Sequence, residues 1–351
     1  MKLALVALSR HGKVLGQRVK ELFPQPIDFY LAENYVEEGD EITSFPPSKL
    51  SVLVGDLFSK YQGIIFIMAL GIVVRKIAPY LQDKRVDPAI VVMDEKAEAV
   101  ISVLSGHLGG ANQLTRKLAK VLDSKPVITT ATDVHGKIAL DLVAQELKCQ
   151  IKPFSNLKKV SGAVVNDQQV NIFSQYSLPI RETENLKIYP LENYPAKDQG
   201  KATVLVTNQA LPIPEKKPYV FLIPQNVAIG IGCRRGVEKE KILAAIQWAL
   251  TTTGIQQASV ACLSSIDLKN DEEGLLEAAA ELGIATKFFT KEEIEQLTEE
   301  YAVSNFVKNK IGVNGVCEQT AILALKKPKL ILPKSVPVAG VTVAMATEQF
   351  L

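Results

Sequence analysis

In two long parts of this chain, short apolar runs alternate with predicted helices, and this alternation is the feature that most constrains the fold. Strand-like runs at Leu3–Leu8, Gly63–Met68 and Val227–Ile231 are each followed by a segment predicted to be helical. Repeated strand–helix units are typical of sheets with mainly parallel strands covered by helices. The sequence therefore predicts an α/β fold.

The alternation is weaker from about residue 131 to residue 224, where we expect helices at Ile138–Leu147 and Asn156–Val165. Leu211–Pro218 holds three prolines, which favour an extended linker. We therefore expect two α/β domains with mainly parallel sheets, joined by a less regular middle region. The expected limits are residues 1–130 for the N-terminal domain, 131–224 for the middle region and linker, and 225–351 for the C-terminal domain.

One hairpin is expected inside the first domain. The apolar runs Ala89–Met93 and Ala99–Val103 flank Asp94–Lys96, whose polar residues are typical of a turn. Elsewhere the loops are expected at the carboxyl ends of the strands, where α/β folds bind their ligands.

Composition excludes several classes of protein. A formal net charge of +2 over 351 residues argues against a general nucleic-acid binder. The longest apolar run, Gly63–Val74, is too short to span a membrane and is followed by Arg75 and Lys76. The four cysteines have no CxxC spacing and are too few for a disulfide scaffold, which favours a reduced, cytoplasmic location.

Two glycine-rich loops carry the residues most suggestive of a site. Ser105–Asn112 places His107, one of three histidines, just before a helix predicted at Gly109–Leu122. Gly230–Gly236 contains the adjacent Arg234 and Arg235. Glycines let a ligand approach the backbone, a helix start favours an anion, and guanidinium groups suit carboxylates. The loops indicate a site for an anionic small molecule, although ordinary glycine turns would give the same pattern.

Four motifs follow one another along the chain: SGHLGGAN (Ser105–Asn112), TTATD (Thr129–Asp133), GIGCRRG (Gly230–Gly236) and GVNGVCEQTA (Gly312–Ala321). In this order they resemble the CbiG family, the cobalt-precorrin-5A hydrolases of the anaerobic cobalamin pathway. Met68–Glu95 is also similar to that family, and the last domain is similar to CobE. The resemblance reaches nearly the whole chain, although residues 151–220 carry no motif of the family.

The resemblance implies hydrolysis of the δ-lactone ring of cobalt-precorrin-5A, giving cobalt-precorrin-5B and acetaldehyde. The substrate is an anionic tetrapyrrole that carries its own cobalt, so we expect no cofactor and no metal site in the protein. Absent CxxC and HxxxH pairs agree with this expectation. A homodimer and transient contact with other corrin-pathway enzymes are further expectations.

Lactone opening needs a base to activate water, donors for the oxyanion and a pocket for carboxylates. His107 is the first candidate base, and Glu318 is the second. The backbone at Gly109 and Gly110 is expected to supply donors. The cations expected to pair with the acetate and propionate arms are Arg75, Lys76, Arg234 and Arg235. The other residues expected to bind substrate are Ser105, Gly106, Asn112, Thr130, Asp133, Gly232, Cys233 and Asn314.

Several of these residues have a second interpretation. His107 could instead cap a helix, fill a hydrogen bond in the core or ligate the substrate's cobalt. Cys233, beside two arginines before a helix, is expected to have a lowered thiol pKa and could be a nucleophile, or simply a small buried residue. Glu318 could complement a helix dipole.

Other functions also remain open at this stage. A non-catalytic carrier or partner protein for a cobalt tetrapyrrole would need the same basic, glycine-lined pocket without a working base. A nucleotide-binding enzyme is disfavoured because GxxxxGK[ST] is absent and no GxGxxG follows the first strand, and a triad hydrolase because GxSxG is absent. Turnover separates a hydrolase from a carrier.

Overall fold

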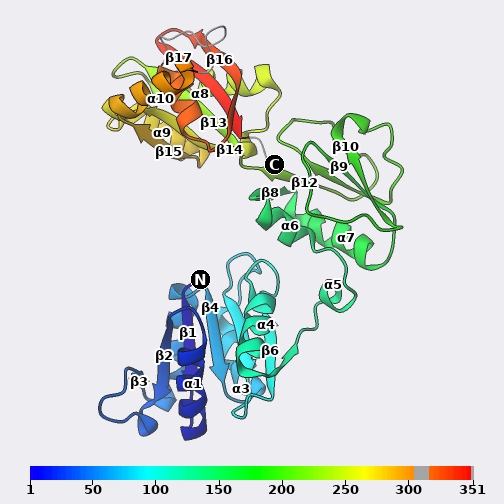
Figure 1. Cartoon of the computed structure of the whole chain (residues 1–351), viewed down its shortest axis with the longest axis vertical. Coiled ribbons are helices and arrows are strands. Elements are labelled where there is room, and N and C mark those ends of the chain that lie inside the picture. The colour runs from blue at the N-terminus through cyan, green and yellow to red at the C-terminus, as the bar shows by residue number, and fades with distance from the viewer. Residues whose placement is uncertain (304–315, 349–351) are drawn as a thin grey trace. The chain divides into compact units, whose positions relative to one another are not determined.

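A computed structural model describes residues 1–303 and 316–348 of the chain (Figure 1). Met1–Leu142 and Val143–Leu351 form two compact units, and each is described by itself. Three sheets of mainly parallel strands confirm the expected α/β fold. The boundaries expected near residues 130 and 224 stay predictions. Within the described ranges, no helix is both long and apolar enough to cross a membrane.

The first unit is built on a seven-stranded sheet with the order β3-β2-β1-β4-β5-β6-β7. Every residue of its inner strands β1, β4 and β5 is buried, because helices cover both faces. The strands are β1 (Leu3–Ala7), β2 (Ile27–Ala32), β3 (Thr43–Phe45), β4 (Gly63–Ile67), β5 (Ala89–Met93), β6 (Ala99–Leu104) and β7 (Lys125–Val127).

Two pairs of amphipathic helices cover that sheet. One apolar cluster packs α1 (Arg10–Leu22) and α4 (Ala111–Leu122) on one face, and a second packs α2 (Leu50–Lys60) and α3 (Leu70–Ile77) on the other. Two short helices follow at the end of the unit, α5 (Ala131–Val134) and α6 (Leu140–Glu146), of which α6 continues into the second unit.

The expected hairpin at Asp94–Lys96 is confirmed, and the strands of this sheet that follow it run in the opposite direction to those before it. The Asp94 carboxylate accepts N–H bonds from Lys96 at 2.9 Å and from Ala99 at 2.7 Å, which holds the turn. β6 is antiparallel to β5, with Leu104 opposite Ile90, and β7 is parallel to β6. The carboxyl ends of β6 and β7 therefore lie at the edge where β1, β2, β4 and β5 begin.

The middle region is more regular than expected. It forms its own five-stranded sheet with the order β10-β9-β11-β12-β8, in which β8 alone is antiparallel to its neighbour. Its elements are β8 (Cys149–Lys152), α7 (Phe154–Val165), β9 (Val170–Ser174), β10 (Leu186–Pro190), β11 (Ala202–Val206) and β12 (Tyr219–Pro224).

The C-terminal sheet has the order β15-β14-β13-β17-β16, with β13, β14 and β15 parallel and the hairpin β16–β17 antiparallel to β13. An apolar cluster packs α8 and α9 against this sheet. The strands are β13 (Val227–Cys233), β14 (Val260–Ile266), β15 (Ala285–Phe289), β16 (Pro328–Val338) and β17 (Val341–Glu348), and the helices are α8 (Lys239–Thr253), α9 (Glu273–Leu282), α10 (Lys291–Val303) and α11 (Val316–Leu323).

Candidate active site

Two segments that are distant in sequence leave the first sheet at the same edge. Ser105–Gly110 follows β6, and the residues up to Asp133 follow β7, which pairs in parallel with β6 through Ile101 and Val127. The carboxyl ends of parallel neighbours lie side by side. This arrangement brings His107 and Asp133 together.

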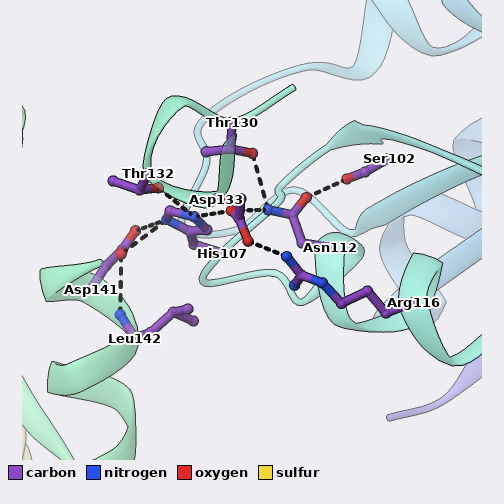
Figure 2. A network of polar contacts seen from close by, with 9 residues as sticks. All are labelled: Ser102, His107, Asn112, Arg116, Thr130, Thr132, Asp133, Asp141 and Leu142. Atoms are coloured by element: carbon purple, nitrogen blue, oxygen red, sulfur yellow. Dashed lines mark hydrogen bonds and ion pairs between the residues drawn. The ribbon is translucent and has the colours of Figure 1, made fainter. Parts of the chain in front are cut away.

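His107 lies between two carboxylates (Figure 2). Its Nε2 is 2.9 Å from Oδ2 of Asp133, and its Nδ1 is 3.1 and 3.2 Å from the two carboxylate oxygens of Asp141. The hydroxyl of Thr132 is 3.1 Å from Nε2. The side chains of His107 and both aspartates are only 12–14% exposed, so these ion pairs are largely shielded from water.

Asn112 and Arg116, from the first two turns of α4, hold Asp133 in place. The amide of Asn112 donates to Oδ2 of Asp133 at 2.8 Å and to the hydroxyl of Thr130 at 3.0 Å. Ser102 donates to the other end of that amide at 2.7 Å, which fixes its orientation. Arg116 forms an ion pair with the second oxygen of Asp133. Four predicted site residues thus belong to one network, His107, Asn112, Thr130 and Asp133.

The charges of this network shift the pKa values of its members. The hydrogen bond with Asp141 raises the pKa of His107 most, partial burial opposes it, and Asp133 raises it further. Burial works to raise the pKa of Asp133, but the bonds from Arg116 and His107 outweigh it and hold that pKa below its usual value. Both shifts favour an imidazolium between two carboxylates.

The glycines of this loop are explained by the loop itself. A Cβ on Gly106 would lie 2.8 Å from the side-chain oxygen of Asn112, and one on Gly109 would lie 2.3 Å from Cβ of Ser105. Gly110 has a φ of +85°, which favours glycine, and its N–H already donates to the carbonyl of His107. The hydroxyl of Ser105 donates to the carbonyl of Asp87 at 2.9 Å. Gly110 is therefore not a free oxyanion donor, which corrects that part of the expectation.

The second glycine loop lies at the carboxyl end of β13. Gly230 admits the start of α11, since a Cβ there would be 1.7 Å from the carbonyl oxygen of Cys317. Gly232 similarly leaves room for Thr342 of β17. The fold therefore brings the end of β13 and the start of α11 together, although the two segments lie more than 80 residues apart.

The two arginines of this loop differ in their partners. Arg235 is exposed and donates to Asp271 at 3.0 Å and to the carbonyl of Leu268 at 3.2 Å. Arg234 is also exposed, and its side chain forms no ion pair with any residue that the structure describes. Arg234 is therefore the better placed of the two for an incoming carboxylate.

Cys233 does not have the lowered thiol pKa that the sequence predicted. Partial burial raises its pKa, and Glu272 adds to that effect while Lys269 opposes it. Glu272 is itself buried, accepting from Gly236 N–H at 2.6 Å and from Lys269 at 3.1 Å. The expectation of a lowered thiol pKa was wrong because the loss of water and this buried carboxylate outweigh the nearby cations, and the alternative of a small buried residue agrees better.

Four predicted residues remain to be placed, namely Glu318, Asn314, Arg75 and Lys76. Glu318, in the first turn of α11, is 4% exposed and accepts the N–H of Lys334 at 2.7 Å. Asn314 lies outside the described residues. Arg75 and Lys76 lie in the last turn of α3, where Arg75 contacts the carbonyl of Gly71 at 3.3 Å and Lys76 donates to Ser51 at 2.8 Å.

Sequence reasoning missed four members of the His107 network, namely Ser102, Arg116, Thr132 and Asp141. Arg116 follows Asn112 by four positions, so both lie on one face of α4, and this spacing was a usable signal. Asp141 opens a predicted helix and was indistinguishable from an acidic residue that complements a helix dipole. The described part of the chain contains no group of three or more His, Cys, Asp and Glu side chains arranged to hold a metal ion.

Three family models match the chain one after another. They are described as cobalamin synthesis G N-terminal, over residues 52–133, cobalamin biosynthesis central region, over 138–224, and cobalamin synthesis G C-terminus, over 227–346. His107 and Asp133 fall in the first match, Asp141 in the second, and Arg234 in the third.

Curated relatives agree with these matches. The chain is 36% identical to a cobalt-precorrin-5A hydrolase of Priestia megaterium, covering 91% of this chain and 88% of that protein. It is 32% identical to the protein of the same name from Salmonella typhimurium, over 98% and 97% of the two chains. Protein CobE of a Sinorhizobium species is 24% identical over 34% of this chain and 79% of its own length, which agrees with the expected CobE-like C-terminal domain.

Proposed function

Because this chain belongs to the CbiG family of cobalamin synthesis proteins, we propose that it is the hydrolase that opens the δ-lactone ring of cobalt-precorrin-5A. The reaction adds water across the ring ester, gives cobalt-precorrin-5B and releases the two-carbon fragment as acetaldehyde. The relatives that match nearly the whole chain are named cobalt-precorrin-5A hydrolase, which supports hydrolysis of this substrate.

The observation that best supports an active site for this reaction is the position of His107 between Asp133 and Asp141. Ester hydrolysis needs a group that takes a proton from water and later returns one to the leaving oxygen. A histidine held by carboxylates suits both steps. Among the described residues at the end of β13 and the start of α11, no equivalent base is available, since burial raises the pKa of the Cys233 thiol and Glu318 is buried against a backbone N–H.

In the proposed mechanism, neutral His107 takes a proton from water as the water oxygen bonds to the lactone carbonyl carbon. The carbonyl oxygen then carries the negative charge, and the Gly109 N–H is the backbone donor that we propose for it. The bond from that carbon to the ring oxygen breaks next, and the imidazolium returns its proton to the departing alkoxide. The products of these steps are a carboxylic acid, which loses its proton to water, and a hydroxyl group, and His107 ends neutral as it began. Release of acetaldehyde from the ring-opened product is a separate step.

The substrate's acetate and propionate arms require cations, and Arg234 and Arg75 are the ones that we propose first. Both are exposed, and neither forms an ion pair with a described residue. Arg235 and Lys76 are already engaged, with Asp271 and Ser51 respectively. These two would have to exchange partners to bind the substrate, so we expect smaller contributions from them.

The remaining expectations are kept as proposals. Four free cysteines support a reducing, cytoplasmic location. We expect the reaction to need no cofactor of the protein's own, since cobalt enters with the substrate, and activity should survive chelation and dialysis. A homodimer and transient contact with other corrin-pathway enzymes are also proposed, and gel filtration of the purified chain would test the first.

The test of the function is turnover by the purified full-length chain. Cobalt-precorrin-5A is incubated with substoichiometric protein, while acetaldehyde is assayed and the product mass is measured. We expect many equivalents of aldehyde per chain and the mass of the ring-opened product. A carrier would instead bind the substrate one to one and release no aldehyde, which would overturn the hydrolase proposal.

A further inference from the structure

The two carboxylates that contact the ring nitrogens of His107 differ in how many other hydrogen-bond donors they have. Asp133 is held without His107, because Arg116 binds one of its oxygens and Asn112 donates to the other at 2.8 Å. Asp141 has a single further donor among the described contacts, the N–H of Leu142 at 3.1 Å. Figure 2 shows these partners gathered on opposite sides of the ring.

This difference decides which bond His107 can give up. If Nε2 leaves Asp133, that carboxylate keeps a guanidinium and an amide as donors. If Nδ1 leaves Asp141, a side chain only 14% exposed is left with one backbone N–H. A largely buried carboxylate without donors is strongly disfavoured. The Nδ1 side of the ring is therefore the anchored side, and the Nε2 side is the exchangeable one.

We propose that Asp141 is a positioning residue, which fixes the Nδ1–H of His107 so that Nε2 is the nitrogen that exchanges a proton with the substrate. Asp133 is then the partner of Nε2–H in the resting imidazolium, and loss of that proton to solvent leaves Nε2 free to accept one from the incoming water. This inference rests on the proposed hydrolase function and assigns the geometry of that same site. A carboxylate on Nδ1–H that selects the tautomer of a reacting histidine is a known physical device.

The charged groups that face the ring are few. Asp133 comes from α5, Asp141 from α6, and Arg116 of α4 acts through Asp133. Asp141 is also the partner that contributes most to raising the pKa of His107. Removing its charge should therefore change both the tautomer and the titration of the ring, which a merely structural role would not require.

The test compares Asp141→Asn, Asp133→Asn and the control Glu146→Gln, an exposed carboxylate on the same helix as Asp141. We expect Asp141→Asn to lower kcat by roughly 100-fold or more with little change in KM, the pattern of a lost orienting carboxylate. Asp133→Asn should lower kcat by about 10-fold or less. Asp141→Glu should recover part of the loss, and Glu146→Gln should match the wild type.

A second measurement needs no substrate and so separates this inference from the function itself. The chain has three histidines, and the other two, His11 and His135, are exposed, so ring 15N signals of the full-length protein can be assigned by substitution. We expect the neutral wild-type ring to carry its proton on Nδ1. Asp141→Asn should lower the titration midpoint of His107 and raise the share of the Nε2–H form.

Two results would overturn the assignment. One is an Nδ1–H tautomer and a kcat that both survive in Asp141→Asn. The other is a larger kcat loss in Asp133→Asn than in Asp141→Asn, which would make Nδ1 the reacting nitrogen. Absence of turnover by the wild type, with the tautomer result as expected, would reject the function and leave Asp141 as the anchor of the ring.

Discussion

The two glycine-rich loops look alike in sequence but differ in what their side chains do. In Ser105–Asn112, the glycines make room for neighbouring side chains of the loop, and the polar residues form a shielded network around His107. In Gly230–Gly236, the glycines admit Cys317 and Thr342, and the arginines stay on the surface. Glycine spacing therefore marks close packing in both loops, and the side chains alone distinguish the proposed reacting centre around His107 from the proposed binding surface at Arg234.

The largest expected effect comes from removing the reacting ring in the first loop. His107→Ala should lower kcat by ~100-fold or more, the scale of a lost general base, with little change in KM. His135→Ala is the matched control, because His135 is an exposed histidine that does not belong to the network around His107. Steady-state assays of both variants check this, and a wild-type kcat in His107→Ala would place the chemistry elsewhere, with Glu318 tested next.

The second prediction concerns the packing role of glycine in the other loop. Gly230→Ala would place a Cβ 1.7 Å from the carbonyl oxygen of Cys317, where backbone cannot move cheaply, so we expect a loss of about 3 kcal/mol in the free energy of unfolding. A Cβ at Gly236 would have open space around it, so the only cost of Gly236→Ala is the backbone φ of +72°. We expect this substitution to lower the free energy of unfolding by about 1 kcal/mol. Urea unfolding measures both, and equal losses would refute the packing explanation.

A smaller effect is expected for the surface arginines. Arg234→Ala should raise KM about 10-fold at low salt with kcat nearly unchanged, since one charged hydrogen bond of roughly 1.5–3 kcal/mol is lost. Arg235→Ala should do less, because Arg235 is already paired with Asp271. The loss should shrink as salt is added. A kcat defect without a KM defect would remove these residues from the proposed binding surface.

The smallest effect is a pH dependence of stability. The folded state raises the pKa of His107, so its stabilising contribution is complete below the unfolded pKa of about 6.5 and is lost as pH rises through the folded pKa. Tm of the wild type should therefore exceed that of His107→Gln more at pH 6 than at pH 9. A difference in Tm that grows with pH would contradict the imidazolium between two carboxylates.

Much of the fold could be predicted, because buried strands and amphipathic helices leave clear patterns. The apolar runs of β1, β4, β5 and β13 were all identified, and so was the hairpin at Asp94–Lys96. In the middle region the two edge strands, β8 and β10, were not identified, since both are only partly buried. Edge strands pack on one neighbour and need less continuous apolar sequence.

The site could be predicted only in part. The family's motifs already contained His107, Asn112 and Asp133, which the parallel pairing of β6 and β7 brings together. Asp141 depends on a contact between residues 34 positions apart, and no local pattern encodes such a contact. The wrong expectation for Cys233 has a similar origin, since Glu272 reaches that loop from a distant segment.

The most direct test of the central claim, that His107 moves the proton in lactone opening, compares two titrations of the wild-type protein. One is the pH profile of kcat/KM on cobalt-precorrin-5A, which reports the free enzyme. The other is the midpoint of the His107 ring signals. We predict that kcat/KM falls as pH falls through an apparent pKa above 6.5 and that this value coincides with the ring midpoint. A kcat/KM that stays flat through the His107 midpoint would contradict the account.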